Sequence, residues 1–220
     1  MPKTVDHALR RHDLGEALWR VAEREGMPGV SVRSVAAEAG ISPGSLRYYF
    51  SSQADLILFA MELLVERATN RITARIEAIG EGEDPVDWLT DLFKEGLPLD
   101  AQRRVEIDVW SAFMEQARTD PLLLPARQME WSASQMLCRT AVVNLRSLSI
   151  QTTPDTPLEG PLEAEASLLH AVWDGLVNQL SVFPETEREA LADRLLRLHL
   201  TGIRERGQAG ECLSGVSGAP

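Results

Sequence analysis

The segment Ser31–Phe50 limits the folds open to this chain more than any other, because two helix patterns flank a glycine. The apolar residues at positions i, i+3, i+4 and i+7 of the first pattern are Val32, Val35, Ala36 and Ala39. Gly40 ends that helix, since glycine accepts a positive φ. Ser42 and Pro43 begin the next helix, with a capping hydroxyl followed by proline at the first helical position. The segment therefore predicts a helix, a tight turn and a second, short helix.

The second helix has an inward face and an outward face of different chemistry. Its inward apolar residues are Leu46 and Phe50, whereas its outward residues are Ser45, Arg47, Tyr48 and Tyr49. Hydroxyls, an arginine and tyrosines can contact phosphates and base edges of DNA. A short second helix offered to the major groove is the helix-turn-helix arrangement. The alternative is an ordinary helical corner in which the two tyrosines are half buried.

The stretch AAEAGISPGSLRYYFSSQADLI resembles the DNA-binding signature of the TetR family of bacterial repressors, AxxAGVSxGxLYxYFxSKxxL. The match covers roughly residues 10–60, and GSLRYYF with the later WDGL looks most like the BetI-like branch. Two positions depart from the family pattern. Arg47 stands where most members have tyrosine, and Gln53 stands where most have a phosphate-contacting lysine. The resemblance implies a homodimeric, ligand-responsive repressor.

The residues that we expect to contact DNA lie on this segment or beside it. They are Arg33, Ser42, Pro43, Ser45, Arg47, Tyr48, Tyr49 and Gln53. In TetR-like proteins an arginine at the place of Arg33 can reach a base, although an ordinary surface arginine is the alternative. Gln53 would donate to a phosphate from the start of the next helix, where N–H groups favour anions. The expected partner is a double-stranded DNA operator.

Helical patterns recur along the whole chain, and runs of alternating β-branched residues are absent. We therefore expect an all-α fold of about nine helices, with a three-helix head and a larger helical ligand-binding and dimerisation body. The head with the helix-turn-helix would span residues 1–52, the body 53–206, and a disordered tail 207–220. The tail, GQAGECLSGVSGAP, is too small and polar to pack.

The net charge of −11 is unusual for a protein that binds DNA, but it is unevenly distributed. Residues 1–53 carry seven Lys and Arg against six Asp and Glu, a charge of +1, which leaves −12 for the remainder. The acidic body would repel DNA everywhere except at the head, which favours one docking orientation. Affinity must then come from placed contacts and from doubling in a dimer.

The sequence also limits the cellular compartments and the bound metals or cofactors that we expect for this protein. No apolar run approaches the roughly 18–20 residues that span a bilayer, and the N-terminus lacks the apolar core of a signal peptide. We therefore expect a cytoplasmic protein with no membrane partner. The two cysteines, Cys138 and Cys212, lack metal-ligand spacing. No cofactor and no metal is expected.

The last two predicted helices, residues 162–183 and 185–204, are apolar on more than one side, as in helices placed between neighbours. The resemblance implies that this pair forms a four-helix interface with its symmetry mate. The expected interface residues are Leu169, Trp173, Leu176, Leu180, Leu191, Leu195 and Leu198. A homodimer holds two heads about one helical turn apart, so that they read a palindrome. The alternative is a pair of core helices within one chain.

Large aromatic and sulfur-containing side chains lie on the predicted inward faces of the body helices. With one glutamine they form the predicted ligand pocket: Trp88, Trp110, Phe113, Met114, Trp131, Gln135, Cys138 and Trp173. Such residues suit a largely apolar small-molecule effector. The alternative is that these stripes are ordinary core.

The sequence therefore favours a transcriptional regulator, a repressor that an effector releases from a palindromic operator. An all-α enzyme is the first alternative, but no phosphate loop, GxSxG or metal-spaced His/Cys set is present. His170 and Asp174 share a helical face and could hold a metal, form an acid–base pair or make a polar spot. A protein-interaction module is the second alternative, and it would not need the outward cluster around Arg47.

Overall fold

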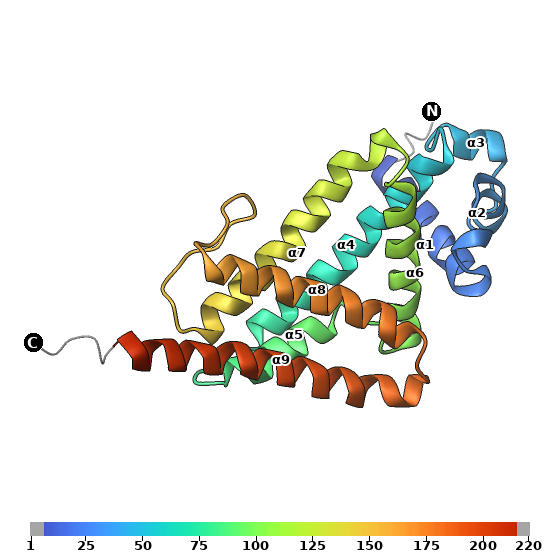
Figure 1. The fold of residues 1–220 in the computed structure, drawn as a ribbon. Helices are drawn as coiled ribbons and strands as arrows, with labels where there is room; N and C mark the ends of the chain where they lie inside the picture. The colour runs from blue at the N-terminus through green and yellow to red at the C-terminus, as the bar shows by residue number, and fades with distance from the viewer. Residues whose placement is uncertain (1–6, 215–220) are drawn as a thin grey trace, which may run out of the picture. The chain divides into compact units, whose positions relative to one another are not determined.

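The computed structural model describes residues 7–214, with side chains placed for residues 10–208, and this part of the chain is all-α as predicted (Figure 1). The described residues form nine α-helices and two 3-10 helices. In chain order these are α1 (His7–Glu25), η1 (Met27–Gly29), α2 (Val32–Glu38), α3 (Pro43–Arg47), α4 (Gln53–Glu77), α5 (Pro85–Lys94), α6 (Ala101–Gln116), η2 (Pro121–Leu123), α7 (Leu124–Leu145), α8 (Pro161–Ser181) and α9 (Glu185–Ser214).

The helices divide into two compact units. The first comprises Met1–Asn70 and Asp100–Arg127, and the second comprises Arg71–Leu99 and Gln128–Pro220. The first unit therefore holds α6 together with the three predicted head helices, although the sequence predicts α6 as part of the body. Helix α6 packs against α1 and η1. Periodicity identifies the apolar face of α6, but it does not say which helix covers that face.

The core of the first unit draws on every helix in it. Fully buried side chains come from α1, α2, α3, α4 and α6, and they include Leu18, Val35, Leu46, Leu56 and Phe113. Burying one such side chain stabilises the fold by about 1.5–3 kcal/mol. The short helix α3 is thereby fixed to the larger helices around it.

The turn between α2 and α3 forms as the sequence predicts. Gly40 has a φ of 66°, in the left-handed region. The Ile41 N–H donates to the Ala36 carbonyl at 3.0 Å, and the Gly40 N–H donates to the Ala37 carbonyl at 3.2 Å. These two bonds are the Schellman pattern that satisfies the last carbonyls of a helix. On the far side of the turn, Ser42 caps α3, as its hydroxyl accepts from the Ser45 N–H at 3.0 Å.

The second unit is built on α8 and α9, which run side by side in opposite directions, with α5 packed on α9 (Figure 1). Its buried apolar side chains include Leu89, Phe93, Leu169, Leu176, Leu180, Leu196, Leu200 and Ile203. Ion pairs accompany the α5–α9 contact: Lys94 lies 2.7 Å from Asp193, and Arg197 pairs with Asp87. Because these pairs are partly exposed, packing rather than charge carries most of the stability.

The C-terminal end of the described chain differs from the sequence-based expectation. Helix α9 continues through residues 207–214, where a disordered tail is predicted. Adding residues to a formed helix is far cheaper than nucleating one, so α9 extends into small and polar residues. Residues 1–6 of the predicted head and 215–220 of the predicted tail lie outside the described residues. Among residues 7–214, no helix combines the length and apolarity that a membrane span requires.

The turn generates a first prediction. A Cβ added at Gly40 would meet nothing within 4 Å, so the cost of Gly40→Ala is backbone strain alone. We expect this variant to lower the free energy of unfolding by about 1–2 kcal/mol, the cost of placing an L-residue in the left-handed region. Urea unfolding followed by circular dichroism measures this change.

Gly44→Ala in α3 is the matched control. A Cβ there would meet only the Ser42 hydroxyl at 3.7 Å, and Gly44 is not among the residues with positive φ. Alanine also has the higher helix propensity. If both variants changed the unfolding midpoint equally, Gly40 would not be the conformational stop of α2.

Candidate nucleic-acid interface

Helix α3 is held by its inward face and exposes the other. Leu46 is 0% and Phe50 is 2% exposed, and Phe50 packs on Phe59 with ring centroids 4.9 Å apart. The residues predicted to contact DNA that α3 leaves exposed are Ser42, Pro43, Ser45, Arg47 and Tyr48. Buried anchors on one side fix the direction in which polar groups on the other side point. The structure thus brings five of the eight predicted residues onto one exposed surface, which we call the α3 face.

The two tyrosines have different surroundings. Tyr48 is 75% exposed, whereas Tyr49 is half buried and packs against the core of the first unit. Their rings meet edge to face, with centroids 5.4 Å apart and planes at 86°. The Tyr49 ring therefore packs against the Tyr48 ring and limits the positions that it can take. The sequence predicts that both rings point outward, whereas Tyr49 is partly covered. The position of a residue in a short helix does not reveal how the residues after that helix pack.

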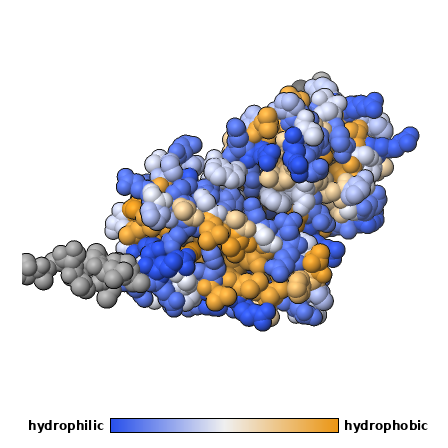
Figure 2. Space-filling model, viewed as in Figure 1, coloured by the Kyte–Doolittle hydropathy of each residue, from blue (hydrophilic) through white to orange (hydrophobic). Residues whose placement is uncertain are grey.

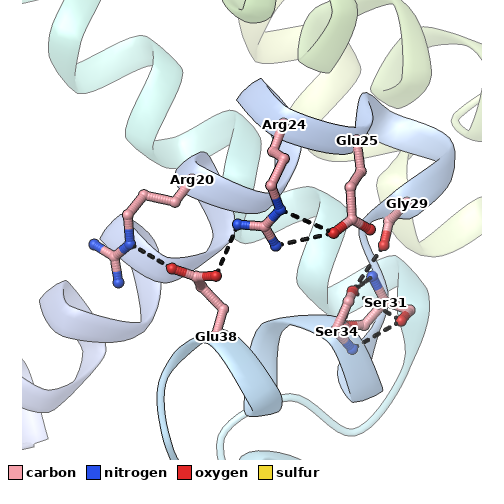
Figure 3. Close-up of polar contacts among 7 residues, drawn as sticks. All are labelled: Arg20, Arg24, Glu25, Gly29, Ser31, Ser34 and Glu38. Atoms are coloured by element: carbon pink, nitrogen blue, oxygen red, sulfur yellow. Dashed lines mark hydrogen bonds and ion pairs between the residues drawn. The ribbon is translucent and has the colours of Figure 1, made fainter.

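Arg33 is exposed in the first turn of α2, and the start of this helix is firmly capped. The Ser31 hydroxyl accepts from the Ser34 N–H at 3.1 Å, and the Ser34 hydroxyl accepts from the Ser31 N–H at 2.9 Å. The Ser34 hydroxyl also donates to the Gly29 carbonyl at 2.7 Å (Figure 3). This reciprocal capping box fixes the backbone that carries Arg33.

Gln53 has a structural contact that the sequence does not reveal. Its Nε2 donates to the Val30 carbonyl at 2.8 Å, so the amide links the start of α4 to the segment before α2. The predicted phosphate contact by Gln53 would have to use the second N–H of the same amide. No local pattern signals this bond, because the two residues are 23 positions apart.

Gly44 is a candidate that the sequence-based set leaves out. It lies on the exposed side of α3 beside Ser45, and its backbone is uncovered there. Since its φ is not positive, the turn does not require glycine at this position. A residue without a side chain lets the backbone come close to a partner. The signal in the sequence that could have identified it is a glycine inside a short helix, where glycine lowers helix stability.

An ion-pair cluster joins α1 to α2 (Figure 3). Glu38 accepts from Arg20 Nε at 2.7 Å and from Arg24 Nη1 at 2.9 Å, and Arg24 also pairs with Glu25. The hydrogen bonds from Arg20 and Arg24 hold the pKa of the Glu38 carboxyl below its ordinary value. The same bonds from Glu25 and Glu38 raise the pKa of Arg24. Two of the basic residues on α1 are thus neutralised within the first unit.

The residues predicted for a ligand pocket are divided between the two units. Phe113 is fully buried in the core of the first unit, and Trp110 and Met114 pack against that core. In the second unit, Trp173 donates from Nε1 to the Phe93 carbonyl at 3.1 Å, and Trp88 is half buried. The α7 residues Gln135 and Cys138 are buried there, whereas Trp131 is 52% exposed. Burial also raises the pKa of the Cys138 thiol, which keeps it protonated.

The residues predicted for a dimer interface differ in how far they are buried within the single chain. Leu169, Leu176 and Leu180 are buried within the chain's own second unit, and Trp173 contacts Phe93 there. Leu191 and Leu195 are half buried, and Leu198 is exposed. Apolar side chains gather on the surface over α8 and α9 (Figure 2). The exposed large apolar residues of α8, its C-cap and α9 include Leu168, Val182 and Leu198. Helical periodicity marks apolar faces, but it does not separate a core face from a surface one.

Known protein families match both the N-terminal and the C-terminal segment of the chain. Residues 15–60 match the family model of bacterial regulatory proteins of the tetR family, and residues 85–205 match the C-terminal model of BetI-type transcriptional repressors. The transcriptional regulator PksA of Bacillus subtilis is 32% identical, over 92% of this chain and 94% of PksA. The regulator BetI of Burkholderia cenocepacia is 24% identical over 79% of this chain and 84% of BetI. A transcriptional regulator of Rhodococcus, solved by crystallography, is 28% identical with a TM-score of 0.69, covering 89% of this chain and 96% of that one.

The α1–α2 ion pairs generate a second prediction. We expect Glu38→Gln to lower the urea midpoint at pH 7, because the neutral amide loses its pairing with Arg20 and Arg24. A carboxyl whose pKa is depressed by folding contributes stability above its unfolded pKa, about 4.3 for glutamate, and loses it as the pH falls through the folded value. The difference between wild type and variant should therefore shrink towards zero in acid. Urea unfolding from pH 7 down to pH 3 measures it.

Glu66→Gln on α4 is the control, since it removes one exposed carboxylate from the same unit. It should leave the midpoint nearly unchanged at every pH. A gap between Glu38→Gln and wild type that stayed constant into acid would contradict an electrostatic origin.

Proposed function

Because the chain belongs to the TetR family of bacterial transcriptional regulators, we propose that it is a repressor that binds a specific palindromic operator through the α3 face. The observation that carries this proposal is the exposure of Ser42, Ser45, Arg47 and Tyr48 on a helix whose opposite side is fully buried. A fixed helix with exposed hydroxyl and guanidinium groups can place them in the major groove.

Arg47 is the residue on which we expect DNA affinity to depend most. It is exposed on α3, and its guanidinium can bind a phosphate or pair with two acceptors on guanine. The family lysine is replaced here by Gln53, whose amide already bonds Val30. We propose that Arg47 supplies the positive charge that the lysine gives to other members. Ser42, Pro43, Tyr48 and the uncovered backbone at Gly44 would complete the contact, with Arg33 beside it.

We propose that the working form is a homodimer joined through α8 and α9. Apolar residues of both helices line a surface groove: Val172, Leu176, Leu195 and Leu198, together with Gly175 and Gly202. Glycines on a helix face allow close approach of a second pair of helices. A two-fold pair of heads doubles the contacts with a palindrome, which compensates for the small positive charge of each head.

We propose that a small-molecule effector binds the second unit and lowers operator affinity. The C-terminal family match, residues 85–205, supports this assignment because it is to a repressor domain. An effector acts only through a difference in its affinity for the DNA-competent and released forms. In this proposal the protein acts only by binding DNA and effector, and no residue has a catalytic role.

A third prediction concerns Arg47. We expect wild-type protein to bind the DNA immediately upstream of its own reading frame more tightly than random competitor DNA. Arg47→Ala should weaken this binding at least about tenfold and reduce the salt slope by about 2, because one charged DNA contact is lost from each of the two subunits. Fluorescence anisotropy across a salt series measures both quantities.

Arg118→Ala is the matched control, since Arg118 is an exposed arginine of the first unit that lies outside the α3 face. If Arg47→Ala bound the upstream fragment as tightly as Arg118→Ala does, α3 would not be the reading helix. Failure to enrich any fragment in a genome-wide selection would contradict sequence-specific binding itself.

A fourth prediction concerns the dimer. Leu198 is 72% exposed in the single chain, and an apolar interface would bury it. We expect Leu198→Glu to shift the protein from dimer to monomer, because burying an unpaired carboxylate is strongly unfavourable. Sedimentation velocity measures the change. Leu122→Glu, at a leucine that is 77% exposed in η2, should leave the dimer intact, and a monomer-forming effect at both positions would argue against an α8–α9 interface.

A further inference from the structure

A polar cluster connects α7 to α8 inside the second unit. We call it the α7–α8 cluster and define it by Gln135, Arg139, Glu163, His170 and Asp174. Gln135 and Arg139 come from α7, and the other three come from α8. Gln135 is 1%, Arg139 is 4% and His170 is 7% exposed. Polar groups as buried as these require partners, so their hydrogen bonds define the chemistry of the cluster.

All three guanidinium nitrogens of Arg139 donate hydrogen bonds. Its Nη2 donates to Glu163 Oε1 at 2.8 Å and its Nε donates to Glu163 Oε2 at 2.9 Å, a two-pronged pair. Its Nη1 donates to the carbonyls of Thr153 and Pro154, at 3.3 and 3.0 Å. Arg139 therefore balances the charge of Glu163 and binds the loop between α7 and α8 through two of its carbonyls.

The orientation of the Gln135 amide follows from its neighbours. Its Nε2 donates to Glu163 Oε1 at 3.0 Å and to the Ser167 hydroxyl at 3.2 Å. An ionised carboxylate only accepts, so the atom facing Glu163 must be the nitrogen. The amide oxygen then faces His170 Nδ1 at 2.9 Å. Since that oxygen can only accept, the proton of a neutral His170 ring is on Nδ1.

This proton position leaves His170 Nε2 as a lone-pair acceptor. Asp174 Oδ1 lies 3.8 Å from it, which is too long for a direct hydrogen bond, and the Asp174 side chain is half exposed. The two acceptor atoms are close enough for one donor group to reach both. Burial raises the pKa of the Asp174 carboxyl, and the nearby His170 opposes that rise. With Arg139 and Glu163 balanced, Asp174 gives the cluster a net charge of −1 when His170 is neutral.

An aromatic ring lies near His170. The Trp131 ring centroid is 6.2 Å from that of His170, with planes at 36°, and Trp131 is 52% exposed. An indole face attracts a cation within about 6 Å and also offers apolar area. The surroundings of His170 therefore combine a carboxylate, two acceptor atoms and an aromatic ring.

We propose that the α7–α8 cluster is the effector site of this protein and that it binds a protonated primary or secondary amine with an apolar substituent. One ammonium nitrogen can sit about 2.8 Å from both His170 Nε2 and Asp174 Oδ1, the usual length of a charge-assisted bond. The apolar substituent then rests on Trp131. This inference rests on the proposed function, since it names the ligand class of the effector site.

The geometry separates an amine from other candidates. A quaternary ammonium has charge but no N–H, so it leaves both acceptors unpaired. A neutral alcohol donates only one hydrogen bond and does not balance Asp174. A metal ion needs more ligands than this pair, and within residues 7–214 no group of three His, Cys, Asp or Glu is placed to hold one.

The test uses three probes of similar shape on the full-length protein without DNA: benzylamine, benzyl alcohol and benzyltrimethylammonium. Isothermal titration calorimetry at pH 7 measures each affinity. We expect benzylamine to bind at least about tenfold more tightly than the other two, since only it supplies both charge and two N–H donors. Asp174→Asn should weaken benzylamine binding at least about tenfold, and Trp131→Leu should weaken all three probes.

Asp155→Asn is the control for net charge, because it removes an exposed carboxylate from the same unit and should leave binding unchanged. Equal binding of benzylamine and benzyl alcohol, no binding of benzylamine, or full binding by Asp174→Asn would each overturn the proposed site. Operator binding in the same preparations separates the two proposals. An amine that binds through Asp174 but leaves operator affinity unchanged would support the site and contradict its role as the effector site.

Discussion

The burial of Leu46 and Phe50 is the interaction on which the α3 face depends. Helix α3 has only five residues, and a helix of that length does not persist in water without tertiary contacts. Its direction is therefore set by two apolar side chains inserted into the core of the first unit, where Phe50 meets Phe59. The Schellman turn at Gly40 and the Ser42 cap satisfy the backbone on either side. Together they allow a short, otherwise unstable segment to present polar groups in fixed positions.

Electrostatics in the first unit are local rather than global. The chain carries a net charge of −11, yet its basic residues have distinct uses. Arg20 and Arg24 are paired with Glu38, so they hold α1 against α2 instead of attracting an anion. Arg33 and Arg47 are exposed on α2 and α3. A protein of this charge can recognise DNA when a few cations are well placed and the remaining charge lies elsewhere, because placed contacts supply specificity that net charge cannot.

The second unit combines an apolar surface with a buried polar network. The exposed leucines of α8 and α9 suit association with a second copy, whereas the α7–α8 cluster places charged and hydrogen-bonding groups between two helices. Residue types alone suggested an apolar pocket, since tryptophan and methionine are frequent in both cores and ligand sites. The contacts give a different emphasis: Arg139 is balanced by Glu163, and Asp174 is left facing a histidine lone pair. A carboxylate 3.8 Å from a histidine that lies near Trp131 constrains the charge of a ligand more than the surrounding apolar area does.

The sequence by itself determined the all-α class, the helix–turn–helix segment, the cap at Ser42, the stop at Gly40 and the family. These features depend on φ preferences and on hydrogen bonds between residues a few positions apart, so they can be read from order alone. Tertiary structure decided which helix covers each apolar face. It placed α6 with the head helices, buried Leu169 and Leu180, turned Tyr49 inward and used Gln53 to bond Val30. A helical period shows that a face is apolar, but its partner is chosen by packing between residues distant in the chain, and that information exists only once the chain is folded.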